Sequence, residues 1–597
     1  MKYGANTSAW LRFHTSYFIH DTSYISSSRG VTLIDTIVGS ALMLVVFLGI
    51  AAAFQFSVEV VTTNKARAGA IALGNERMEY LKSLSYAQIG VIGGIPAGNV
   101  VQLETVVLNA ITYTRRTMVF YSDDPQDGTG GSDSNGITAD YKTIRVEVSW
   151  MAKNIERNIT LVGRVSPSSV ESAVPGGTIT INAVNAASVP LFNAQVDIAN
   201  TETAPAINLR TYTDMNGTVS FIGAPAASNY QITVSKPGYS TAQTYPVTGP
   251  NPNPDPRHLT VSNNQTTSAT FAIDLTSSKT IETYKQTVPR TWTDTFANGS
   301  SIATTSNTTT SGGVVRLAGS VPYAPAGSLQ SVDITSTLLA RWNELSWVDT
   351  TPALTDIRYH IYDATSGGAT LIPDSVLSGN SAGFTDSPID LSMISTSTYR
   401  ILRIGADLSS SDSSVTPNID SWNMSYDYGP EPFPNFSFTL RGAKTIGNSP
   451  TVYKYDATIV SDTNASLSLP TLEWDTYTIG MLSTSGYDLA ESCAPQPEAL
   501  PPGSTQTTRV YVLPDSTHSL LVDVRASGGA LVNDATAVLT RTGFSATKKT
   551  SVCGQAFFSS LTNAIYSITV SKTGYQNYSN ANLNISGDTK LSVVLQP

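Results

Sequence analysis

The chain has 597 residues, which at roughly 100–200 residues per domain is enough for several domains, and its formal net charge is -10. Its 35 Lys and Arg residues are outnumbered by 45 Asp and Glu residues and form no basic run, which argues against nucleic acid as a partner. It has five histidines, two cysteines and no HExxH, GxSxG, Walker A, GxGxxG or CxxC motif, so the sequence does not predict an enzyme.

The strongest signal is an apolar segment near the N-terminus. Arg29-Gly30 is followed by Val-Thr-Leu-Ile-Asp at 31–35 and by an uncharged run at 36–58. The run of 23 residues is long enough to span a bilayer, which needs about 20. The residues ahead of it carry more basic than acidic groups, so we expect a single pass with the N-terminal flank in the cytoplasm and the C-terminal region outside.

This segment resembles the leader of type IV prepilins, in which a membrane peptidase cuts after a glycine and the new N-terminus is methylated. The resemblance implies that residues 1–30 are a leader, that cleavage falls between Gly30 and Val31, and that Val31 is methylated. The family usually has Phe and Glu at the first and fifth mature positions, where this chain has Val31 and Asp35. An uncleaved signal-anchor helix is the alternative.

The resemblance also implies a role for Asp35 in subunit docking. A carboxylate at the edge of the hydrocarbon is costly without a partner, and the implied partner is the free amine of a neighbouring subunit's first residue. A surface acid near the positive end of the helix dipole is the alternative.

The next segments predict an α+β module. The helical pattern continues to a Gly- and Pro-rich stop near residue 90, which predicts one long helix over 31–90, membrane-spanning in its first half and amphipathic later. Strand-like runs between residues 100 and 165 predict a small antiparallel sheet within 91–167. By the pilin resemblance, the second half of the helix packs on this sheet.

An acidic loop lies between two of these predicted strands, at residues 122–136. Hard cations are bound by several carboxylate and carbonyl oxygens, and the loop supplies such atoms. The candidate calcium ligands are Asp123, Asp124, Asp127, Asp133 and Asn135. A solvated hairpin connection rich in turn residues is the alternative, and no other cofactor is expected.

From about residue 175 the sequence predicts all-β sandwich domains in tandem. A pattern with a DxxG-like turn and the strand YQITVSKPGY in 171–277 recurs as YSITVSKTGY in 515–597, with a weaker copy in 434–514. The pattern resembles the carboxypeptidase regulatory-like domain, a seven-stranded sandwich without peptidase activity. The resemblance implies a stalk or adhesive module.

The stretch 280–430 is not a copy, and we expect a jelly-roll or lectin-like domain there. It holds four of the seven tryptophans. Trp342 and Trp347 are five positions apart, so on one unbroken strand they face opposite sides, and one of them would be available to stack on a sugar ring. Burial of both is the alternative.

The two cysteines, Cys493 and Cys553, lie in successive predicted domains. We expect them to form a disulfide, which fits an exported protein and would stabilise it by roughly 4 kcal/mol in the loop-entropy model. Free buried thiols are the alternative.

Together these features predict a minor type IV pilin-like subunit. Its partners would be other pilin subunits, a prepilin peptidase, the inner membrane and a surface glycan or protein ligand. It would reside in the cytoplasmic membrane before assembly and in a cell-surface filament afterwards, displaying its sandwiches for adhesion. The alternatives are a pseudopilin of a type II secretion or DNA-uptake machine and a membrane-anchored carbohydrate-binding surface protein.

Overall fold

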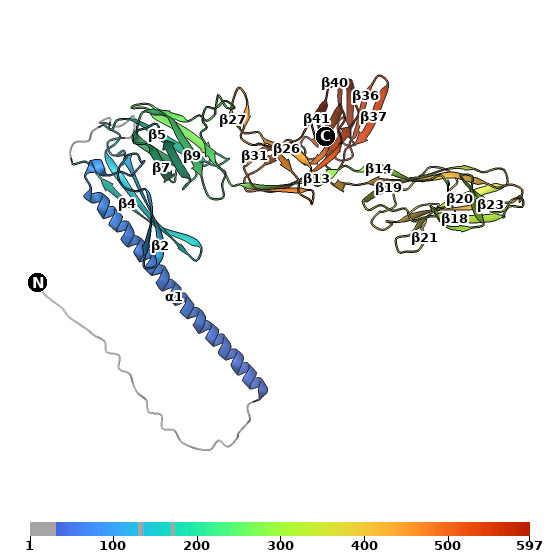
Figure 1. Cartoon of the computed structure of the whole chain (residues 1–597), viewed down its shortest axis with the longest axis horizontal. Coiled ribbons are helices and arrows are strands. Elements are labelled where there is room, and N and C mark those ends of the chain that lie inside the picture. Colours follow the sequence, from blue (N-terminus) through green and yellow to red (C-terminus); the bar gives the residue numbers. More distant parts are fainter. Residues whose placement is uncertain (1–31, 129–133, 135–136, 169–172) are drawn as a thin grey trace, which may run out of the picture. The chain divides into compact units, whose positions relative to one another are not determined.

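The computed structural model describes residues 32–128, 134, 137–168 and 173–597. Contacts divide the chain into two compact units. The first comprises the described residues up to Val91 with Asn99–Val119 and Lys142–Ser168, and the second comprises the other described residues. One long N-terminal helix is followed by strands in sheets, which confirms that part of the predicted architecture (Figure 1).

The first unit begins with helix α1, Leu33–Ser83, of 51 residues. The helix is long and apolar enough to cross a membrane, and its apolar stretch of 18 residues is 0% buried. The buried residues of α1 all lie in its C-terminal part: Ala66, Ala70, Leu73, Gly74, Met78 and Leu81. The helix ends before residue 90 because Leu84 is extended and Ser85 begins a separate 3-10 turn, Tyr86–Gln88.

The sheet of the first unit has four strands in the order β1-β2-β3-β4. They are β1 (Leu103–Leu108), β2 (Ile111–Ser122), β3 (Tyr141–Ala152) and β4 (Ile155–Val165). The hydroxyl of Tyr113 on β2 donates to the carbonyl of Ala66 over 2.9 Å, and Nη1 of Arg115 donates to the carbonyl of Leu73 over 3.0 Å. These bonds join the sheet to the C-terminal part of α1.

The second unit contains a first sandwich of two layers. Its strands are β5 (Gly177–Val184), β6 (Gln195–Asn200), β7 (Ile207–Tyr212), β8 (Thr218–Ala224), β9 (Ala227–Ser235), β10 (Ala242–Gln243), β11 (Leu259–Val261) and β12 (Thr266–Ala272). One layer has the order β12-β5-β8, and the other has β10-β9-β6-β7 with β11 paired to β9. Every second residue of β5 is buried, as expected for a strand with one face on a core.

A second sandwich is built from two separate parts of the chain. Its strands are β13 (Ser277–Lys285), β25 (Glu431–Pro432), β26 (Ser437–Gly442), β27 (Thr445–Gly447), β28 (Val452–Tyr453), β29 (Asp456–Val460), β30 (Ser466–Leu472), β31 (Asp475–Met481), β32 (Tyr487–Cys493), β33 (Glu498–Leu500) and β34 (Thr505–Pro514). One layer has the order β25-β13-β34-β32 with β30 paired to β13, the other has β29-β26-β31-β33, and β27-β28 form a ribbon.

This pairing corrects the domain boundaries that we expected at 280 and 434. Strand β13 pairs in parallel with β34, from Ser278 with Thr505 to Lys285 with Val512, and Ile281 is buried in the core formed by the later strands. The first strand of the second sandwich therefore lies before the middle domain, which is an insertion. The repeat pattern could not show this, because it aligned only the later strands.

The inserted domain occupies residues 288–428 and has two layers. Its strands are β14 (Val288–Asp294), β15 (Ile302–Ser306), β16 (Thr308–Ser311), β17 (Val314–Leu317), β18 (Ala326–Ser331), β19 (Leu339–Thr350), β20 (Thr355–Asp363), β21 (Thr370–Leu371), β22 (Ile389–Asp390), β23 (Leu402–Ser410) and β24 (Asn418–Tyr428). The layers are β16-β17-β24-β19-β22, with β14 paired to β24, and β15-β18-β23-β20-β21. Because Val288 pairs with Tyr428, the chain leaves and returns at neighbouring positions.

A third sandwich ends the chain. Its strands are β35 (Ser519–Ala526), β36 (Thr536–Arg541), β37 (Phe544–Lys549), β38 (Gln555–Phe558), β39 (Ala564–Ser571), β40 (Tyr578–Ile585) and β41 (Asp588–Leu595). The layers have the orders β38-β35-β41 and β37-β36-β39-β40. In all three sandwiches the first strand pairs in parallel with the last, as β5 with β12, β13 with β34 and β35 with β41.

The repeated DxxG-like turn has a steric basis at its glycine. Gly217 has a φ of +71°, and a Cβ built on it would lie 2.6 Å from the carbonyl oxygen of Ala183. Gly554, at the same place in the third sandwich, has a φ of +69° and would bring a Cβ to 2.9 Å from the carbonyl oxygen of Val524. Both positions therefore favour glycine through conformation and through lack of space.

We predict that Gly217→Ala destabilises the first sandwich more than Gly238→Ala does. Gly238 also has a positive φ of +79°, but a Cβ there meets nothing within 4 Å. Gly238→Ala should therefore lower the free energy of unfolding only by the cost of the left-handed backbone conformation, about 1–2 kcal/mol. Amide hydrogen exchange of β5 and β8 should be faster in Gly217→Ala. Equal protection in the two variants would show that the close approach to Ala183 is unimportant.

Candidate functional site

The start of α1 carries the residues expected at a processing and docking site. Gly30 and Val31 lie outside the described residues. Thr32 is the N-cap, and its hydroxyl accepts a bond from the backbone N–H of Asp35 over 3.3 Å. The Asp35 carboxylate in turn accepts from the backbone N–H of Thr32 over 3.1 Å and from its hydroxyl over 2.8 Å. Asp35 thus closes a reciprocal capping box, a role that our sequence reasoning missed.

The apolar part of α1 leaves large side chains exposed. Leu33 is 79% exposed, Phe47 64% and Phe56 67%, and burial along the helix begins only at Ala66. Near the transition, the carboxylate of Glu59 pairs with Nζ of Lys153 on the β3–β4 turn over 2.7 Å. An exposed apolar surface of this extent requires a lipid or protein environment.

The acidic loop brings together some of its predicted calcium ligands. Carboxylate oxygens of Asp123, Asp127 and Asp140 all lie within 4.8 Å of one another. Asp140, which directly precedes β3 and is 3% exposed, was not among the predicted ligands. One of its oxygens accepts a bond from the backbone N–H of Asp124, whose own carboxylate accepts from Gln126 instead.

The other predicted calcium ligands, Asp133 and Asn135, lie outside the described residues. Calcium binding at this loop therefore stays a prediction, with Asp140 added to the ligand set. Three converging carboxylates suit a hard cation in chemical type.

The two tryptophans that we expected as ligand-binding residues are buried. Trp342 is 0% exposed and Trp347 is 7% exposed, so neither ring is available to stack on a sugar as we expected, and the alternative of burial of both is what the structure has. The register of β19 on β24 shifts between Trp342 and Glu344, and this irregularity puts both indoles on the inner face. Nε1 of Trp342 donates to the carbonyl of Tyr399 over 2.9 Å, while Trp347 stacks on Tyr359 with ring centroids 3.9 Å apart.

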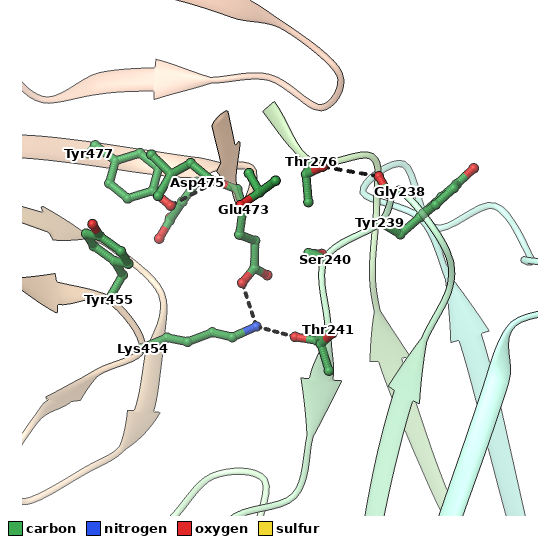
Figure 2. A pocket seen from close by; sticks show the side chains of 12 residues that line it. Gly238, Tyr239, Ser240, Thr241, Thr276, Lys454, Tyr455, Glu473, Asp475 and Tyr477 are labelled. Carbon is green, nitrogen blue, oxygen red and sulfur yellow. Dashed lines mark hydrogen bonds and ion pairs between the residues drawn. The ribbon is translucent and has the colours of Figure 1, made fainter. Parts of the chain in front are cut away.

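A cavity of about 450 Å³ lies between the first and second sandwiches (Figure 2). Nζ of Lys454 donates to the carbonyl of Thr241 over 2.8 Å and pairs with Glu473 over 2.6 Å. Lys444 also pairs with Glu473, over 2.8 Å. These groups are paired with one another, so the cavity is best described as part of a joint between two sandwiches. Its residues come from distant segments. Gly238 and Tyr239 end the repeated strand pattern, whereas no sequence motif marks Lys454 and Glu473.

A second joint connects the second and third sandwiches. Cys493 of β32 and Cys553, just before β38, form a disulfide with Cα atoms 5.1 Å apart. Beside it the backbone N–H of Ser492 donates to Oε1 of Gln555 over 2.7 Å. A small apolar cluster completes the joint: Ala490, Leu521 and Phe557, with Leu489 and Leu513 packed against them.

No family model and no curated protein matches the chain. Solved structures similar to it include the TIE protein of Bacillus anthracis, at 10% identity and TM-score 0.15, covering 83% of this chain and 73% of that one. They also include BcpA, the major pilin subunit of Bacillus cereus, at 10% identity and TM-score 0.12, covering 70% and 99%. The full-length major pilin SpaD from Corynebacterium diphtheriae is 9% identical with TM-score 0.13, covering 70% and 97%. All three TM-scores are far below 0.5, so these likenesses carry no argument about function.

We predict that Cys493→Ser with Cys553→Ser lowers the free energy of unfolding of the third sandwich, by about 4 kcal/mol in the loop-entropy model for a separation of 60 residues. Thermal unfolding of the oxidised chain with and without reductant measures this loss. The double variant is the control, because reductant should leave its unfolding unchanged. Full thiol labelling of the unfolded, unreduced wild-type chain would contradict the disulfide.

Proposed function

We propose that the chain is a pilin-like subunit of a cell-surface filament, of the type IV kind. A prepilin peptidase cuts between Gly30 and Val31, Val31 is methylated, and α1 holds the subunit in the cytoplasmic membrane until it joins other subunits. The sandwiches and the inserted domain lie outside the cell and serve in attachment. The pseudopilin alternative shares this N-terminus and differs in the machine that the filament drives.

The observation that carries this proposal is the division of α1 into two parts. From Leu33 to Lys65 the helix is exposed and largely apolar, whereas its buried residues begin at Ala66 and strand β2 donates hydrogen bonds to the carbonyls of Ala66 and Leu73. A helix that served only as a core element would be buried along its length, and a plain anchor would need no packed continuation. A subunit that leaves the bilayer for a filament needs both parts, because neighbouring helices then replace lipid around the apolar part.

The size of the exported region favours a minor position in the filament. More than 400 residues follow the first unit, and that bulk on every subunit would crowd a helically packed shaft. A tip position avoids this crowding. The carbohydrate-binding alternative has lost its main support, because Trp342 and Trp347 are buried.

The first prediction of this proposal concerns the mature N-terminus. Mass spectrometry of the protein from cells with a prepilin peptidase should find a chain that begins at Val31 and carries an N-terminal methyl group. Cells that lack the peptidase should retain residues 1–30. Retention of the leader in both strains would leave a plain signal anchor and remove the filament role.

A second prediction separates the capping role of Asp35 from its proposed docking role. Thr32→Ala removes the reciprocal cap at a cost of about 1 kcal/mol but keeps the carboxylate, whereas Asp35→Asn removes the charge. If Asp35 docks on a neighbouring subunit's amine, Asp35→Asn should abolish incorporation into filaments and Thr32→Ala should not, with equal membrane levels of both. Incorporation is measured by immunoblot of sheared filaments. Equal incorporation of the two variants would show that Asp35 caps the helix and has no docking role.

A further inference from the structure

A group of three carboxylates lies at the joint between the second and third sandwiches. Asp488 belongs to β32, Asp515 to the connection from β34 to β35, and Asp588 begins β41. One carboxylate oxygen of each lies within 4.8 Å of the others. Ion pairs to basic side chains are absent from all three within the described part of the chain. This joint cluster therefore concentrates negative charge.

One member of the joint cluster is buried and only half satisfied. Asp488 is 3% exposed, and one of its oxygens, Oδ2, accepts from the backbone N–H and the hydroxyl of Ser516 over 3.1 and 2.9 Å. Its other oxygen, Oδ1, is buried without a hydrogen-bond partner among the described residues. A buried carboxylate oxygen without a partner is costly.

The electrostatics of the joint cluster agree with this geometry. Burial, followed by the charge of Asp588, raises the pKa of Asp488 to about 6.

We infer that the joint cluster of Asp488, Asp515 and Asp588 binds a hard divalent cation, with Ca²⁺ as the expected ion. Carboxylate oxygens are the ligands that Ca²⁺ prefers, and water completes such sites. Asp515 and Asp588 are exposed, so an ion can reach the buried oxygen of Asp488 from solvent. Because its ligands come from both sandwiches and their connection, the ion would hold the joint at a second place besides the disulfide. This inference does not depend on the filament role.

The test is a Ca²⁺ titration of the full-length chain in detergent, by calorimetry after chelation, at Ca²⁺ concentrations up to ~1 mM, the range of extracellular calcium modules. Asp588→Asn should remove one saturable binding event and the Ca²⁺-dependent rise in the unfolding temperature of the third sandwich. Asp588 is exposed, so this variant should fold. Asp456→Asn is the matched control, since Asp456 is an exposed residue of β29 outside the joint cluster.

Asp140→Asn separates this site from the acidic loop, and the joint event should persist in that variant. The inference is overturned if Asp588→Asn binds Ca²⁺ as the wild type does, or if the only binding event is the one lost in Asp140→Asn. It is also overturned if the wild-type chain binds no Ca²⁺.

Discussion

The parallel pairing of first and last strands is the constraint on which the three sandwiches depend. The pairs are β5 with β12, β13 with β34 and β35 with β41. In each sandwich the chain therefore enters at one end of the strand pair and leaves at the opposite end. A parallel pair cannot be closed by a tight turn, so the remaining strands must form the connection between its members. Each sandwich is thereby complete in itself and can follow another along the chain.

The joints between sandwiches depend on side chains from loops and strand ends. At the joint between the first and second sandwiches, Glu473 forms ion pairs with Lys444 and Lys454. At the joint between the second and third sandwiches, the contacts are a disulfide, a hydrogen bond to the buried Gln555 and a small apolar cluster. Polar contacts of this kind are specific in geometry but contribute little apolar burial. A covalent bond at the second joint is therefore a physically sensible addition, because it does not depend on buried area.

Sequence reasoning succeeded where a period or a local residue type decides the structure. The apolar run, the repeated strand pattern and the glycine of the turn are all local signals, and the helix and strands follow from them. It failed where distant segments meet. The membership of β13 in the second sandwich, the shift in β19 that buries Trp342 and Trp347, and the roles of Asp140 and Asp488 depend on register and on long-range pairing. No periodicity in one sequence encodes such relations.

The insertion within the second sandwich has a mechanical consequence. A pull on the two ends of this sandwich acts on Ser277 and Pro514, at opposite ends of the parallel pair of β13 and β34, so the hydrogen bonds between these strands are loaded together in shear. The inserted domain is attached after Lys285 and before Glu431, beyond the far end of β13. Tension along the chain therefore bypasses it. A domain attached in this way keeps its own folded shape while the sandwich that carries it is under tension.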